Sequence, residues 1–311
     1  MNASLFGATV LIWGSTWIAI ALQVGPVPVL VSVFYRFSVA AAVFLVVLAA
    51  MGRLRLPTLR QQPFILLQAL CLFSCNFICF YAAERVTPSG IVSLVFSLAT
   101  IYNAVIARVV FGDPISGRVL VAAALGIGGL LLVLGGDGSL ALDPGSLKGI
   151  GLAALGTLFF SLGNMTSRRN SAAGIPPETA NAFGMAYGAA ILLALIGATG
   201  TPMIPPPDAR YVAALLYLAV VGSVVGFTTY LVLVARIGTA RAAYATVLFP
   251  IVALALSTAF EGYRWHWTGV VGLVLTLLGN VVVFTGRPRP VGATRAARSR
   301  LSSGQDRGEA A

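Results

Sequence analysis

Two tryptophans lie four residues apart near the middle of an apolar segment at the start of the chain. Trp13 and Trp17 flank a Gly-Ser-Thr step in the run from Ser4 to about Val24. Tryptophan usually marks the membrane surface, where its ring N–H stays hydrated. One helical turn apart, the two rings share a face. If that face lines a cavity, the indoles meet water, a ligand or an ammonium group. The alternative is packing, with a neighbouring helix's carbonyl accepting the indole hydrogen.

Hydroxyl, amide and aromatic side chains recur at helical spacing in other apolar segments. Ser89, Ser93, Ser97 and Thr100 form one stripe, and Thr157, Ser161, Asn164 and Arg168 form another. Each alone is explained by hydrogen bonds between membrane helices, but together they favour a hydrated cavity. The predicted substrate-binding residues are Trp13, Trp17, Asn76, Phe80, Tyr81, Ser93, Ser97, Phe160, Asn164, Tyr230, Tyr244 and Thr246.

No Asp or Glu falls in the core of a predicted span, and the single histidine, His266, falls at the outer edge of the last one. Intramembrane hydrolysis or metal chemistry needs such groups at depth, so we expect no catalytic residue, no metal, no cofactor and no enzyme activity. Cys71, Cys75 and Cys79 share one helix face without a second kind of ligand, which indicates packing. The missing carboxylates also favour movement down a gradient and net-neutral or zwitterionic substrates.

Two further residues interrupt the apolar segments. Arg36 is the one charge embedded in a span, where it either meets a substrate carboxylate or snorkels and pairs with an acid at the outer end. Pro250 removes a helical hydrogen bond and should bend its helix, either as a gate or as a static kink. We assign it a gating role.

The elements that must position these residues are membrane-spanning helices. The 311 residues are 58% hydrophobic and only 9% charged, with a mean hydropathy of +0.94, whereas a soluble domain is about 25% charged. The chain is therefore predicted to be an all-α integral membrane protein. Its ten predicted spans are 4–24, 29–51, 63–83, 89–110, 117–136, 148–168, 178–200, 208–235, 241–260 and 267–286.

Charge sets the predicted orientation. Most arginines fall in the loops and tail on the side of the N-terminus, so the positive-inside rule places both termini in the cytoplasm. The net charge of +11 follows from this bias and requires no nucleic acid. The tail at 287–311 is predicted to be disordered and to touch anionic lipid.

An internal repeat is visible between the halves. Trp13-Gly-Ser-Thr-Trp17 matches Phe160-Ser-Leu-Gly-Asn164, and Phe111-Gly112-Asp113 matches Phe260-Glu261-Gly262. Because each half has five spans, the second copy, 144–286, must cross the membrane inverted relative to the first, 1–143. Inverted repeats usually hold a substrate site at their interface near the midplane, which makes transport the leading prediction.

The five-plus-five spans, the Trp-Gly pair and the Gly-acidic steps resemble the EamA-type branch of the drug/metabolite transporter superfamily, most closely its YddG-type amino acid exporters. The likeness covers about 4–286. Two departures concern substrate choice: Leu98-Ala99-Thr100 lacks the proline that Pro250 provides in the other half, and Phe160 stands where relatives often carry tryptophan.

The resemblance implies amino acid export, neutral, hydrophobic or aromatic side chains included, by alternating access through a central cavity. We expect a multi-pass protein of the inner membrane that works as a monomer on a small-molecule substrate. The alternatives are a multidrug or lipophilic-cation exporter of the same fold, a channel and, last, an intramembrane enzyme. A channel would normally show rings of charge or a repeated carbonyl filter, and neither is evident in the sequence.

Overall fold

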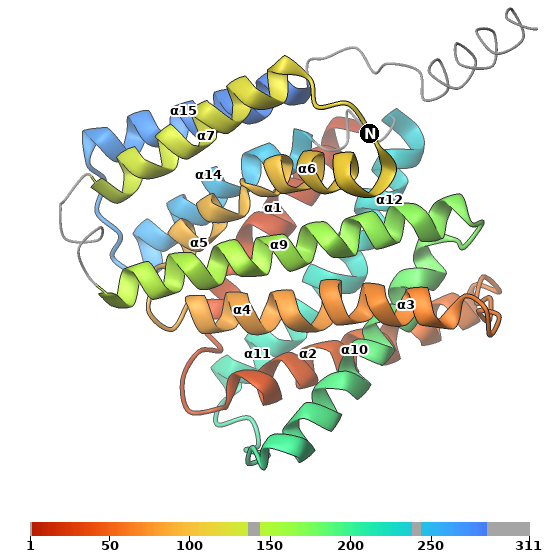
Figure 1. Cartoon of the computed structure of the whole chain (residues 1–311). Helices are drawn as coiled ribbons and strands as arrows, with labels where there is room; N and C mark the ends of the chain where they lie inside the picture. The colour runs from red at the N-terminus through yellow and green to blue at the C-terminus, as the bar shows by residue number, and fades with distance from the viewer. Residues whose placement is uncertain (1, 136–143, 238–243, 285–311) are drawn as a thin grey trace, which may run out of the picture.

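The computed structural model describes residues 2–135, 144–237 and 244–284, and every regular element in these ranges is a helix (Figure 1). Eight helical segments there are long and apolar enough to cross a membrane, and two shorter apolar helices follow them. The predicted all-α fold of ten spans in two repeats is confirmed. The predicted tail at 287–311 lies outside the described residues.

Several spans consist of more than one helical element. The first half contains α1 (Asn2–Ala21), α2 (Val29–Ala50), α3 (Gln62–Ala69), η1 (Leu70–Cys75), α4 (Asn76–Ala83), α5 (Ser89–Phe96), α6 (Ala99–Phe111) and α7 (Gly117–Gly135). The second half contains α9 (Pro144–Ala172), α10 (Pro177–Thr199), α11 (Ala209–Leu216), η2 (Tyr217–Val225), α12 (Gly226–Ile237), α14 (Tyr244–Phe260) and α15 (Trp267–Phe284).

The third and eighth spans each contain a π-helix, η1 and η2, at equivalent places in the two halves. In both, a serine hydroxyl donates to the carbonyl five residues earlier: Ser74 to Ala69 at 3.2 Å and Ser223 to Leu218 at 2.9 Å. Such widened turns are uncommon and often lie at functional sites. Their recurrence is a structural counterpart of the repeat seen in the sequence.

The fourth span breaks between α5 and α6 without a proline. The amides of Ser97 and Leu98 bond to carbonyls three residues back, Leu94 and Val95, both at 3.0 Å. This tightened turn separates the two helices. The corresponding span in the second half, α14, is continuous and keeps Pro250 inside the helix.

The halves pack into one another. Helix α2 packs against α10, α7 against α15, and α1 against α14, while α9 lies against α4, α5 and α6 (Figure 1). Glycine permits the closest of these approaches: a Cβ added to Gly129 of α7 would lie 2.9 Å from the amide nitrogen of Thr276 in α15. The interface between α7 and α15 is therefore built on close backbone contact.

An acidic side chain also links the halves. The Glu261 carboxylate, just beyond α14, accepts hydrogen bonds from the Ser89 hydroxyl at 2.5 Å and the Ser89 amide at 3.1 Å. Ser89 opens α5, whose positive dipole end favours a carboxylate. Glu261, the acidic residue that follows the ninth span, thus binds the first residue of the fourth span.

Candidate functional site

A cavity of about 540 Å³ lies between the first, third, fourth, sixth, eighth and ninth spans, with contributions from the second and the tenth. These six are the spans on which the sequence places its polar and aromatic stripes. Eight of the predicted site residues line the cavity: Trp13, Trp17, Asn76, Phe80, Ser97, Phe160, Asn164 and Tyr230.

The structure places two predicted residues away from the cavity. Tyr81 is buried on the neighbouring face of α4 and donates to the side-chain carbonyl of Gln23 at 2.7 Å. It follows Phe80 by one residue, which turns it about a quarter circle around the helix. Ser93 is buried and donates to the carbonyl of Gly90 at 2.6 Å, so its hydroxyl is used within its own helix.

The three remaining predictions fall on α14. Pro250 is buried inside this helix and is not among the residues that line the cavity. The side chains of Tyr244 and Thr246 lie outside the described part of the chain. The gating role of Pro250 stays a prediction.

Trp13 both packs and faces the cavity. Its indole N–H donates to the Gly222 carbonyl of η2 at 3.1 Å, and a Cβ at Gly226 would lie 3.0 Å from Trp13 Cδ1. Phe227, Tyr230 and Phe249 surround the ring, with centroids 5.3, 5.0 and 5.5 Å away. The π-helix thus satisfies the indole, while part of the ring still borders the cavity.

Trp17 belongs to an aromatic layer at the buried end of the cavity. Its ring lies 5.3 Å from Phe80 and 5.5 Å from Phe96, centroid to centroid. Phe96 in turn lies 4.6 Å from Phe160, edge to face. We call Trp17, Phe80, Phe96 and Phe160 the aromatic layer. It offers apolar ring surface for stacking, and edge-to-face geometry stabilises the rings against each other.

The sequence analysis missed several cavity residues. Asn103, Phe96 and Asn280 line the cavity but are absent from the predicted set, and Thr100, which lies on one of the predicted polar stripes but not in that set, lines it too. Two of them carried a readable signal, because an amide at membrane depth faces protein or water. The face on which Asn280 lies could not be read from its own span, which otherwise is strongly apolar.

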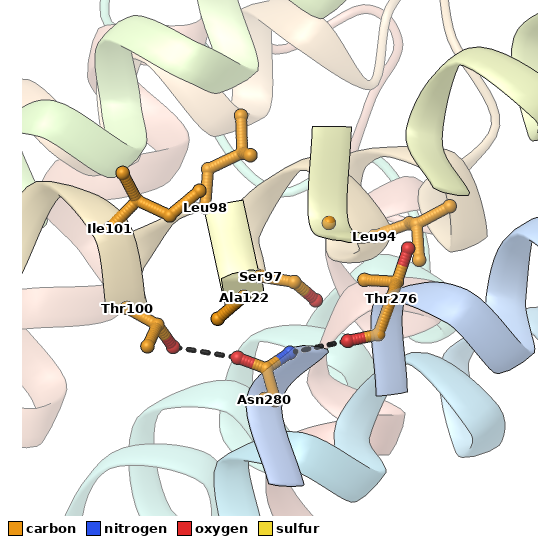
Figure 2. Close-up of a pocket in the computed structure, with 9 residues that line it drawn as sticks. Leu94, Ser97, Leu98, Thr100, Ile101, Ala122, Thr276 and Asn280 are labelled. Carbon is orange, nitrogen blue, oxygen red and sulfur yellow. Dashed lines mark hydrogen bonds between the residues drawn. The ribbon is translucent and has the colours of Figure 1, made fainter. Parts of the chain in front are cut away.

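Asn280 connects the break in the fourth span to α15. Its Oδ1 accepts a hydrogen bond from the Thr100 hydroxyl at 2.7 Å, and its Nδ2 donates to the Thr276 carbonyl at 3.2 Å (Figure 2). A second, small pocket of about 10 Å³ adjoins these groups. The Ser97 hydroxyl borders it without a hydrogen-bond partner, so the pocket suits a single water.

The cavity is more accessible at one end. Trp17, Phe80 and Asn76 are buried, whereas Asn164 and Met165 are partly exposed and Arg168 is exposed. Access therefore runs from the Arg168 end toward the aromatic layer. Asn76 lines this path, and its Oδ1 is buried without a hydrogen-bond partner among the described residues.

Two cations, and no carboxylate among the described residues, line the cavity. Arg168 is neutralised by Asp113 at 2.6 Å and lies 4.3 Å over the Phe111 ring. Arg36 forms no salt bridge with any described residue. The other lining residues are aromatic or aliphatic, with a few hydroxyls and amides, so the unpaired charge at the walls is positive.

Glu84 lies just beyond α4, outside the span, and is buried with neither carboxyl oxygen hydrogen-bonded. Burial raises the pKa of this carboxyl well above its usual range, and Glu261 raises the pKa further, whereas Arg36 lowers it. Glu84 therefore keeps its proton to a higher pH than an exposed glutamate and is a weak counter-ion.

The comparisons with known proteins agree with this architecture. A family model, the EamA-like transporter family, matches residues 3–135 and again residues 147–285. The uncharacterized inner membrane transporter YedA of Escherichia coli K12 is 28% identical over 296 residues, which cover 91% of this chain and 94% of YedA.

Two relatives are named for amino acids. A probable amino-acid metabolite efflux pump of Escherichia coli K12 is 24% identical over 286 residues, 89% of this chain and 90% of the pump. A probable terminal-alkyne amino-acid exporter of Streptantibioticus cattleyicolor is 24% identical over 279 residues, 89% of each chain. One solved crystal structure of a protein superposes with a TM-score of 0.66 at 18% identity, covering 91% of this chain and 96% of the other, which supports the fold.

Proposed function

The chain belongs to the EamA-like transporter family, and from that premise we propose that this membrane transporter exports amino acids through its central cavity. One observation carries the proposal: a cavity of about 540 Å³ reaches the inverted-repeat interface and is walled by rings, hydroxyls and amides. That volume lies in the range of small-molecule sites. Two relatives with amino acid names support the same substrate class.

The transport step we propose is alternating access. The Arg168 end of the cavity is cytoplasmic under the positive-inside orientation, so the described conformation receives its solute from the cytoplasm. The aromatic layer closes the opposite end. Rocking of the interleaved halves would then open the outer side around the same site. Both termini are cytoplasmic in this proposal, a monomer in the inner membrane is the working unit, and no nucleic acid takes part.

The alternative substrates are lipophilic cations or drugs, which the aromatic walls favour by cation–π contact. The unpartnered Asn76 amide and Ser97 hydroxyl favour a polar, hydrogen-bonding solute instead. Ser97→Ala separates the two: amino acid transport should suffer from the lost hydroxyl, whereas movement of a cationic dye should not.

The test is counterflow of radiolabelled amino acids in proteoliposomes containing the purified full chain. Trp17→Ala should abolish counterflow while the protein still inserts and elutes as a folded species. Trp267→Ala is the matched control, because Trp267 is 77% exposed at the start of α15. Full counterflow by Trp17→Ala, or none by the unaltered chain across the amino acids, would overturn the proposal.

A further inference from the structure

Arg36 is a buried cation with unused hydrogen-bond donors. It lies in α2, is only 4% exposed and borders the cavity. Its Nε and Nη1 atoms are buried and have no hydrogen-bond partner among the described residues. A guanidinium is always charged, and a buried charge without partners is costly. Such donors call for a ligand or water, since buried polar groups are normally satisfied.

The surroundings of Arg36 do not supply a carboxylate partner. Its guanidinium carbon lies 4.4 Å from the Phe77 ring centroid and 5.4 Å from that of Phe37. The nearby Tyr81 hydroxyl donates to Gln23, and its oxygen is a neutral acceptor beside the guanidinium. Glu84 attracts the charge, but neither of its oxygens is hydrogen-bonded. By contrast, Arg53 and Arg168 are both paired with acids.

The position of Arg36 joins it to the aromatic walls of the cavity. A Cβ at Gly222 would lie 4.0 Å from Arg36 Nη2, and the Gly222 carbonyl also holds the indole of Trp13. Phe77, over which the guanidinium lies, is 6.3 Å from Phe80 of the aromatic layer, centroid to centroid. A solute with an apolar ring and an anionic end could thus contact the layer and Arg36 together.

We propose that Arg36 binds the carboxylate of the transported solute and makes the cavity select carboxylates over amines. This inference rests on the proposed function and narrows it, since it names the group that all amino acids share. Arginine's fork of N–H donors matches the two oxygens of a carboxylate, and charge-assisted hydrogen bonds of this kind are strong. A lipophilic cation would instead meet a positive wall.

The experiment measures binding of three probes that share one ring. They are L-phenylalanine, 3-phenylpropionate, which lacks the amine, and 2-phenylethylamine, which lacks the carboxylate. Calorimetry on the purified full chain compares the unaltered protein with Arg36→Gln and Arg36→Lys. Arg118→Gln removes the same charge from an exposed site at the start of α7 and is the matched control.

We expect the unaltered chain to bind both carboxylates. It should bind the amine at least about tenfold more weakly than either of them. Arg36→Gln should lower the affinity for both carboxylates by about 10- to 100-fold, the range for hydrogen bonds to charged groups. It should not lower the affinity for the amine, whose ammonium group no longer meets the Arg36 charge. The affinity of Arg36→Lys for the carboxylates should lie between those of the unaltered chain and Arg36→Gln, because lysine keeps the charge but lacks the fork of N–H donors. Arg118→Gln should bind all three as the unaltered chain does.

Several outcomes separate the two proposals. Unchanged carboxylate binding in Arg36→Gln, in a chain that still shows amino acid counterflow, overturns the role of Arg36 alone. Binding of 3-phenylpropionate but of no amino acid supports Arg36 and overturns the amino acid assignment. Binding of neither carboxylate by the unaltered chain overturns the role of Arg36. Should Arg36→Gln fail to fold, the Arg36→Lys affinities decide, and values equal to those of the unaltered chain count against the fork.

Discussion

Replacing Gly129 by alanine tests the packing that joins the two repeats. The added Cβ would lie 2.9 Å from the Thr276 amide nitrogen and closer still to the Gly272 carbonyl oxygen, whereas ordinary contacts begin at 3.4 Å. Both of these groups are backbone, so rotating the Thr276 side chain, whose hydroxyl is also close, cannot relieve the contact. Helices α7 and α15 would have to separate by several tenths of an ångström near the middle of their interface.

Overpacking of this kind costs about 1–3 kcal/mol, which corresponds to a fall in melting temperature of about 2–5 °C for a chain of this size. Gly128→Ala is the control on the next residue, since its Cβ would meet nothing within 4 Å. Both changes remove the same backbone flexibility, so their difference isolates the contact. The assay is thermal unfolding of the detergent-purified chain, followed by size exclusion. Equal melting temperatures for the two variants would refute the close-packing argument.

Three other changes concern two acidic residues beyond the helix ends, Glu84 and Glu261, and the cavity residue Asn280. The raised pKa of Glu84 means that the native state binds more protons than the unfolded one, so stability should fall as pH rises above about 4.3. In melting scans from pH 5 to 8, Glu84→Gln should flatten this fall. An unaltered slope in the variant would contradict the raised pKa. Glu261→Ala should lower the free energy of unfolding by about 1–2 kcal/mol, because it removes the cap of α5. Glu178→Ala, which breaks a half-exposed ion pair with Arg53, should lower it by less than about 1 kcal/mol. The reverse order of these losses would show that the capping contact is weak. Asn280→Leu should cost only about 0.6 kcal/mol in stability yet slow counterflow, and an unchanged initial rate would assign Asn280 to packing alone.

The membrane class, the ten spans and the repeat could be read from the sequence. Hydropathy is summed over about 20 residues, so the exact geometry of each helix hardly affects it. The stripes also identified the six spans around the cavity, and eight predicted side chains border it. Helical spacing shows which side chains share a face, and polar groups at depth rarely face lipid.

The exact facing of single residues was decided by tertiary structure. Tyr81 follows the cavity residue Phe80 by one position, yet turns to Gln23, and the amide of Asn280 reaches the break in the fourth span from α15. Two π-helices and one break without a proline interrupt the regular α-helical hydrogen bonding of the spans that carry them. The sequence left two readings of Arg36, a carboxylate ligand or a paired scaffold cation. The proposal of the first rests on the surrounding helices, which bring no hydrogen-bonded carboxylate from the described residues to its Nε and Nη1 atoms. Packing between distant segments sets such contacts, and no local pattern encodes it.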